Sequence, residues 1–194
     1  MGINLLDLVN NHAGGIWKGN KLKGIIPGGS SAKSLTAEEC DVGMDYESLA
    51  AKDPMLGSGG VIVMDDTTDM VDALYNILRF YAHESCGQCT PCREGTGWLQ
   101  KICGRILHGD GRPEDPDMML DLSKKMCGRT ICVLADAAAF PCESIVSKFR
   151  AEFDEKIEAG DGHERTVHLG GPLVQPGALS AHNQERLDEL QGGH

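Results

Sequence analysis

Three evenly spaced cysteines constrain the fold of this chain more than any other feature of its sequence. Cys86, Cys89 and Cys92 stand three residues apart within the segment His83–Gly95. A cubane iron–sulfur cluster needs four soft anionic ligands, and two successive C-x-x-C steps supply three of them from one short stretch of irregular backbone. The sequence therefore predicts an iron–sulfur site whose fourth thiolate comes from elsewhere in the chain.

Two other kinds of site use the same residue type and fit the spacing less well. Zinc sites combine one C-x-x-C pair with a second pair some distance away, so a third cysteine three residues on would have no role. A redox-active C-x-x-C stands at a helix start beside a βαβ pattern, which this sequence lacks. An iron–sulfur cluster is the one interpretation that uses all three thiolates.

Five cysteines compete for the fourth position. Cys103 and Cys142 fall within expected helices and are adequately explained as small buried hydrophobic residues. Cys40 stands in a polar loop with no neighbouring ligand. Cys127 and Cys132 bracket a glycine-containing loop, whose backbone N–H groups can approach a cluster. Spacing alone leaves the choice between Cys127 and Cys132 open.

The first third of the chain has the pattern of a small α+β unit. Apolar residues recur at helical spacing from Asn4 to His12, and two glycines then end the helix. Short β-rich runs follow at Leu22–Ile26 and Gly60–Met64, each bounded by glycine or proline. Asp45–Lys52 has room for one or two helical turns. The organisation of the chain is therefore expected to change near residue 66.

Beyond residue 66 the pattern becomes helical. Thr67 or Thr68 is expected to cap a first helix that leads to the cysteines, and a second begins after Pro91 and ends before the glycine-rich turn at residues 109–113. A third helix is expected near Pro116, and a fourth from about Pro141 through Phe153. Four helices of this length fit a bundle.

Composition narrows the possible functions. The 194-residue chain has a formal net charge of −11, which argues against a nucleic-acid-binding surface. Its longest apolar stretches, Gly60–Met64 and Val133–Phe140, fall far short of the roughly 20 residues that span a bilayer, and no leader precedes them. From residue 160 onward, glycine breaks and acidic residues predict a loose tail. Eight cysteines without a leader favour a reducing compartment.

Several segments of the sequence resemble those of a known family. The chain from Gly14 to about Phe153 resembles the carboxyl-terminal half of the NADH-binding flavoprotein subunit of respiratory complex I, NADH:quinone oxidoreductase. The segments that carry the resemblance are Ile26–Ser31, Met44–Tyr46, Gly59–Asp65, His83–Gly95 and Gly128–Cys132.

The resemblance implies a ligand set, a fold and a task. In that family the first three cysteines and the cysteine of the Thr-Ile-Cys segment hold one [4Fe-4S] cluster, which nominates Cys86, Cys89, Cys92 and Cys132. The implied fold is α+β, with a partial β-grasp module of the soluble ligand-binding type at residues 1–65, a four-helix cluster-binding bundle at 66–159 and a loose acidic tail at 160–194. The implied task is electron relay from FMN toward quinone. Arg93 and Arg129 flank ligand cysteines and are candidates to offset the cluster's negative charge.

This sequence also differs from the family in ways that matter for function. The family's amino-terminal domain binds FMN and NADH, and no part of it matches this sequence, so this chain alone is not expected to oxidise NADH. Met1 falls inside the β-grasp module, after the point where its first hairpin is expected. A sheet without that hairpin exposes an edge and apolar surface, which predicts a covering partner. By resemblance, the partners are other subunits of the complex I peripheral arm, including the FMN- and NADH-binding part.

The resemblance also implies a location, and it leaves two other functions open. The chain is expected at the cytoplasmic face of a bacterial inner membrane through its partners, or on the matrix side in a mitochondrion. The same motifs occur in the diaphorase subunits of NAD-linked hydrogenases and formate dehydrogenases. A non-redox zinc or structural adaptor module is the third hypothesis.

Overall fold

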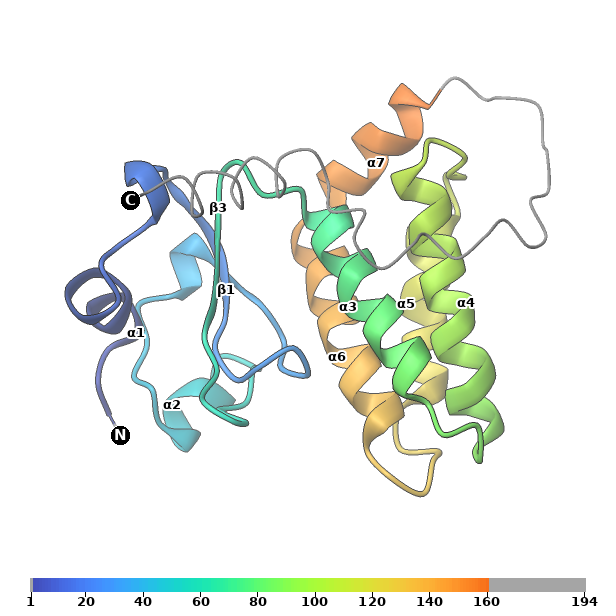
Figure 1. The fold of residues 1–194 in the computed structure, drawn as a ribbon, viewed down its shortest axis with the longest axis horizontal. Coiled ribbons are helices and arrows are strands. Elements are labelled where there is room, and N and C mark those ends of the chain that lie inside the picture. Colours follow the sequence, from blue (N-terminus) through green and yellow to red (C-terminus); the bar gives the residue numbers. More distant parts are fainter. Residues whose placement is uncertain (1, 161–194) are drawn as a thin grey trace, which may run out of the picture. The chain divides into compact units, whose positions relative to one another are not determined.

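A small antiparallel sheet organises the first part of the chain in this computed structural model, which describes residues 2–160 (Figure 1). Strand β1 (Leu22–Ile26) lies in the centre, between β2 (Leu35–Thr36) and β3 (Ile62–Asp65). In the register, Ile25 pairs with Leu35 on one side and with Val63 on the other. The two predicted strands are confirmed, whereas β2 has only two residues and leaves no periodic signal in the sequence.

Short helices complete this part of the structure. Helix α1 (Leu5–Asp7) continues directly as a π-helical turn at Leu8–His12, and α2 spans Tyr46–Ala50. The side chain of Asn4 caps α1 by accepting a hydrogen bond from the N–H of Leu6 at 2.9 Å. A buried apolar cluster joins these helices to the sheet. It consists of Leu5, Val9, Ile25, Leu35, Cys40, Val42, Met44 and Leu49.

Five longer helices form the second part of the described chain. They are α3 (Met70–Glu84), α4 (Thr90–Leu107), α5 (Asp115–Met126), α6 (Leu134–Lys148) and α7 (Arg150–Ala159). Prolines occupy the first turns of α4 and α5, as predicted, because a missing N–H costs nothing there. The cap of α3 differs from the prediction. Asp69, one residue after Thr68, accepts hydrogen bonds from the N–H groups of Val71 and Asp72.

Helix α6 corrects the expected position of the last helix. It begins at Leu134, seven residues before Pro141, and the proline lies inside it. An alanine-rich first half favours the helix strongly enough to tolerate the missing N–H of the proline. The hydroxyl of Ser144 donates to the carbonyl of Pro141 at 3.2 Å. At Phe149 the backbone leaves the helical region (φ −116°, ψ 29°), so the expected single helix is two helices that meet there.

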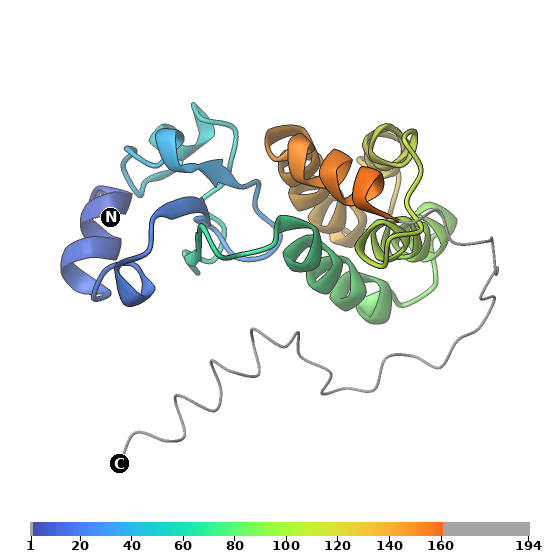
Figure 2. The same cartoon turned by 90° about the horizontal axis from the view of Figure 1, so that it is seen from above.

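The helices share one apolar core. Figure 2 shows the arrangement of these helices along a second direction. Helix α3 packs on α4 and α6, while α5 packs on α4 and α6. Three buried residues from the sheet and the loop after β1 belong to the same cluster: Ile26, Ala32 and Met64. The core of the helices therefore extends to the sheet through direct apolar contact.

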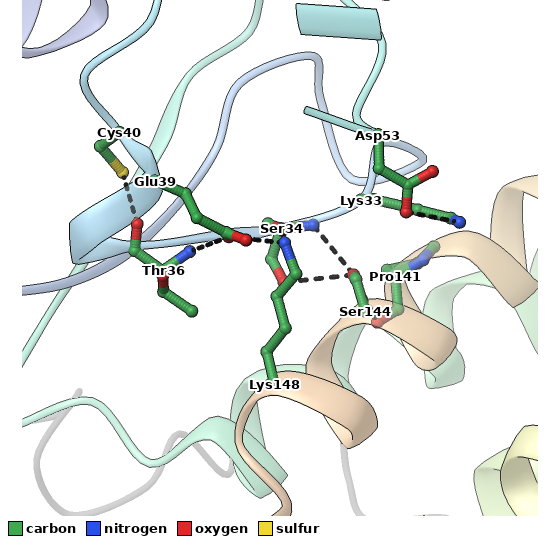
Figure 3. A network of polar contacts seen from close by, with 9 residues as sticks. All are labelled: Lys33, Ser34, Thr36, Glu39, Cys40, Asp53, Pro141, Ser144 and Lys148. Atoms are coloured by element: carbon green, nitrogen blue, oxygen red, sulfur yellow. Dashed lines mark hydrogen bonds and ion pairs between the residues drawn. The ribbon is translucent and has the colours of Figure 1, made fainter. Parts of the chain in front are cut away.

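A buried polar junction also links the chain after β1 to α6 (Figure 3). The N–H of Ser34 donates to the hydroxyl of Ser144 at 2.9 Å, and both residues are buried. The ammonium of Lys148 donates to the carbonyl of Ser34 at 2.8 Å and to the carboxylate of Glu39 at 2.6 Å. Glu39 in turn accepts from the N–H of Thr36 in a capping box. Because these polar groups find partners in one another, the junction holds α6 against the first part of the chain.

The described residues make a mixed helical and sheet structure, in agreement with the α+β prediction at that level. None of the helices in the described range is both long and apolar enough to cross a membrane. The predicted acidic tail lies, from residue 161 onward, outside the described residues.

Candidate metal centre

The three evenly spaced cysteines lie on the turn between α3 and α4 and on the first turn of α4. Cys86 is exposed, Cys89 is half-buried, and Cys92 is 6% exposed and packs into the apolar core. The three side chains thus run from solvent to core along one short segment.

Local backbone rules explain why the chain turns at this position. Ser85 ends α3 in an extended conformation (ψ 121°), and Gly87 then takes φ +80°, in the left-handed region that favours glycine. Cys89 stands just before α4, again extended (φ −93°, ψ 123°). Cys92 therefore lies in the first turn of α4.

Two side chains fix the turn from within. The hydroxyl of Ser85 lies 3.3 Å from the sulfur of Cys92 and accepts a hydrogen bond from the N–H of Gly87 at 3.4 Å. The guanidinium of Arg93 donates to the carbonyl of Gly87 at 3.0 Å and pairs with Glu94 at 2.8 Å. Arg93, predicted as a candidate to offset cluster charge, thus also holds the turn in shape.

The loop between α5 and α6 brings a further cysteine to the same end of the helices (Figure 1). The N–H of Ile131 donates to the sulfur of Cys89 at 3.4 Å, across 42 positions of sequence. The next residue is Cys132, which is exposed. The loop is held at its start by Asp136, whose carboxylate accepts from the N–H of Gly128 at 2.9 Å. Cys132 is therefore one residue away from direct contact with the triplet.

The remaining cysteines stand in environments that favour the neutral thiol. Burial raises the pKa of Cys40 to about 11 and that of Cys142 to about 12, and it raises the pKa of Cys103 as well. The pKa of Cys127 rises to about 11, first through burial and then through the negative charges of Glu143 and Asp136. Iron binds the thiolate form of cysteine. These four residues are therefore poorly suited to ligate it.

The cysteines of the triplet and Cys132 come from two loops, one between α3 and α4 with the start of α4 and one between α5 and α6. Within residues 2–160, no three His, Cys, Asp or Glu side chains are grouped closely enough to hold one metal ion. A zinc ion needs all its ligands within about 2.0–2.3 Å of one point. The thiolates of a four-iron cluster each bind a different iron, so they stand farther apart and come from more than one segment. The contact between Ile131 and Cys89 brings the two cysteine-bearing segments together.

The cysteines could be identified from the sequence, whereas the groups that touch their sulfurs could not. The hydroxyl of Ser85 and the N–H of Ile131 both approach ligand candidates. Ser85 directly precedes Cys86, and this adjacency is the one signal in the sequence that points to it. The amide of Ile131 leaves no signal, because its position depends on the packing of α5 and α6.

The sequence that carries these cysteines matches a known protein family. The family described as the NADH-ubiquinone oxidoreductase-F iron-sulfur binding region matches residues 72–156. This segment begins in α3 and ends in α7, so it includes both cysteine-bearing loops.

Curated relatives agree with that match. The chain is 46% identical over 159 residues to the F subunit of the NADH-quinone oxidoreductase of Rickettsia felis, covering 81% of this chain and 38% of the relative. It is also 46% identical over 160 residues to the corresponding protein of Rickettsia akari, with 82% and 38% covered. The chain thus spans well under half the length of the curated relatives it matches.

A solved structure shares the fold. An NAD+-reducing [NiFe]-hydrogenase in the air-oxidized state superposes with a TM-score of 0.71 and 26% identity over 80% of this chain and 26% of that chain. The same hydrogenase in the H2-reduced state gives the same TM-score and identity.

Proposed function

We propose, from the match of residues 72–156 to the iron–sulfur binding region of the NADH-ubiquinone oxidoreductase F subunits, that this chain relays electrons through one [4Fe-4S] cluster. Cys86, Cys89, Cys92 and Cys132 hold the cluster in this proposal. When bound, such a cluster takes up and releases single electrons. The chain's own residues keep the four thiolates in place and supply hydrogen bonds to their sulfurs.

One contact carries the proposal. The hydrogen bond from the Ile131 N–H to the Cys89 sulfur supports a site built from both loops, since it sets the residue before Cys132 against the triplet. Cys127 begins the same loop, but burial and neighbouring carboxylates raise its pKa and disfavour its thiolate. These observations support Cys132 as the fourth ligand.

The proposal assigns this chain one step of a longer reaction. This chain matches 38% of the relative's length, and we place NADH oxidation and FMN binding in the remainder. We therefore assign electron donation to a partner that carries FMN, and electron acceptance to other subunits on the way to quinone. Such an assembly stands at the cytoplasmic face of a bacterial inner membrane, or on the matrix side in a mitochondrion.

We extend the proposal to the finer description of the fold. The three-stranded sheet with α1 and α2 corresponds to a partial β-grasp module over residues 1–65. Helices α3 to α6 correspond to a four-helix cluster-binding bundle within residues 66–159, and α7 packs beside them. The edge strand β3 carries Ile62 and Val63, which are 41% and 38% exposed, in keeping with a sheet edge that a partner covers.

Anaerobic reconstitution with iron and sulfide tests the proposal. The native chain is expected to bind about four irons and four acid-labile sulfides. Cys132→Ser should lose the cluster, whereas Cys127→Ser is the matched control in the same loop and should retain it. Retention in Cys132→Ser with loss in Cys127→Ser would overturn the ligand choice. Stoichiometric zinc without labile sulfide, in protein purified without oxygen, would instead support the adaptor hypothesis.

A second candidate function rests on the structural likeness to the NAD+-reducing hydrogenase. The chain would then relay electrons in the diaphorase part of a hydrogenase or of a formate dehydrogenase, with the same four cysteines. Genes beside this one discriminate, because a neighbouring gene for the catalytic part of either enzyme favours this candidate. Neighbouring genes for quinone-reducing subunits favour the first.

A further inference from the structure

The hydroxyl of Ser85 is shared between two partners at the turn that carries the cysteines. Its oxygen lies 3.3 Å from the sulfur of Cys92 and 3.4 Å from the backbone nitrogen of Gly87. The nitrogen of Gly87 carries a hydrogen and can only donate. The serine oxygen therefore accepts from Gly87, and its own hydrogen is free to point elsewhere.

Iron binding decides the direction of the second contact. In the metal-free chain, either Ser85 or the thiol of Cys92 can be the donor. A cysteine that ligates iron is a thiolate and has no hydrogen left to give. In the cluster-bound chain the serine hydroxyl is then the donor, and the sulfur of Cys92 accepts.

The surroundings hold this contact in place. Ser85 ends α3, and its N–H donates to the carbonyl of Tyr81 at 3.1 Å, so its backbone is fixed by the helix. Cys92 is only 6% exposed, so little water competes for its sulfur. The ring hydroxyl of Tyr81 is itself anchored, 3.0 Å from the hydroxyl of Ser30 in the loop after β1. A hydrogen bond in such a shielded place is stronger than one in open water.

We propose that Ser85 is a positioning residue that donates a hydrogen bond to the sulfur of Cys92 and thereby raises the reduction potential of the cluster. The inference rests on the proposed function, since it takes Cys92 as a ligand. Reduction adds one electron to the cluster and spreads negative charge onto its sulfurs. A donor aimed at one of them stabilises the reduced form more than the oxidised form.

Redox titration with dithionite under argon, followed by electron paramagnetic resonance, tests this assignment in the reconstituted chain. Ser85→Ala should assemble a full complement of iron and sulfide and show a more negative potential. The expected size is up to about a tenfold change in the ratio of reduced to oxidised cluster, which is about 59 mV for one electron. Ser85→Thr retains the hydroxyl and should return the potential toward that of the native chain.

Ser58 offers a matched control for the turn itself. Its hydroxyl also accepts from the N–H of the residue two positions later, Gly60, at 3.4 Å. Its other contact is the carbonyl of Gly28. Ser58→Ala removes the same kind of turn hydrogen bond with no ligand cysteine beside it, so the potential should equal that of the native chain.

The outcomes separate this inference from the proposed function. A native chain that binds no cluster overturns both. A native chain that binds a cluster, with an unchanged potential in Ser85→Ala, overturns the role of Ser85 alone. If Ser85→Ala fails to assemble, Ser85→Thr and Ser85→Val decide, because they have similar shapes and only threonine has a hydroxyl. Equal potentials in those two variants refute the hydrogen bond, and a more negative potential in Ser85→Val supports it.

Discussion

Replacing Asp115, the buried carboxylate at the start of α5, should destabilise the fold more than replacing an exposed carboxylate on the same helix. Asp115 is completely buried, and the guanidinium of Arg105 on α4 donates a hydrogen bond to each of its two carboxylate oxygens. The distance from the Arg105 Nε to one oxygen is 2.9 Å, and the N–H of Arg112 donates to that oxygen at 2.8 Å. Asp115→Ala removes three hydrogen bonds to one charged group and leaves Arg105 without its partner.

The magnitude follows from burial. Breaking a buried ion pair by removing one partner costs about 3–5 kcal/mol, because the remaining charge stays desolvated. The side chain of Arg105 is 30% exposed and regains some water, so the lower end of that range, about 3 kcal/mol, applies. Asp121 provides the matched control on the same helix. It pairs with Lys125 at 2.6 Å, but the two side chains are 58% and 64% exposed. Asp121→Ala should change stability by less than about 0.5 kcal/mol.

Equilibrium unfolding in urea, followed by far-ultraviolet circular dichroism at neutral pH, measures both variants. With a slope of about 2 kcal/mol per molar urea, a loss of about 3 kcal/mol lowers the midpoint by about 1.5 M. Arg105 lies near the end of α4 opposite to Cys92, so the folded variant should still bind its cluster. Equal losses in Asp115→Ala and Asp121→Ala, or a loss under about 1 kcal/mol in the former, would refute the reasoning from burial.

Two further predictions concern pH and glycine positions. Burial by itself raises the pKa of Asp65, but hydrogen bonds, including one from Asn20, outweigh it and lower the pKa to about 2. The stabilisation by Asp65 is thus present above about pH 4 and lost as the pH falls toward about 2, and acid titration of Asp65→Asn should show a flatter acid limb. Gly104→Ala places a methyl group 2.9 Å from the ring of Tyr75 and should cost about 1–3 kcal/mol in urea unfolding. Gly97→Ala on the same helix meets nothing within 4 Å and should stabilise by about 0.5–1 kcal/mol.

Local patterns predict the elements that have a clear apolar period. The helical period predicted α3 and α4, and the apolar runs predicted β1 and β3, because burial of one face sets these spacings. The start of α6 differs from the predicted one, because Pro141 lies inside the helix and does not begin it. Tertiary packing and the alanine-rich segment before Pro141 hold that helix together. Strand β2 is not predicted, because its two residues are too few to show a period.

Spacing along the chain is enough to gather three thiols at one turn, since Cys86, Cys89 and Cys92 lie within seven residues on a backbone that glycine allows to bend. The other groups that reach this turn are set by the packing of the helices. The N–H of Ile131 meets Cys89 across 42 positions because α5 and α6 pack against the helices that carry the triplet. Such a contact depends on how distant apolar faces fit together, and no spacing along the chain encodes it directly.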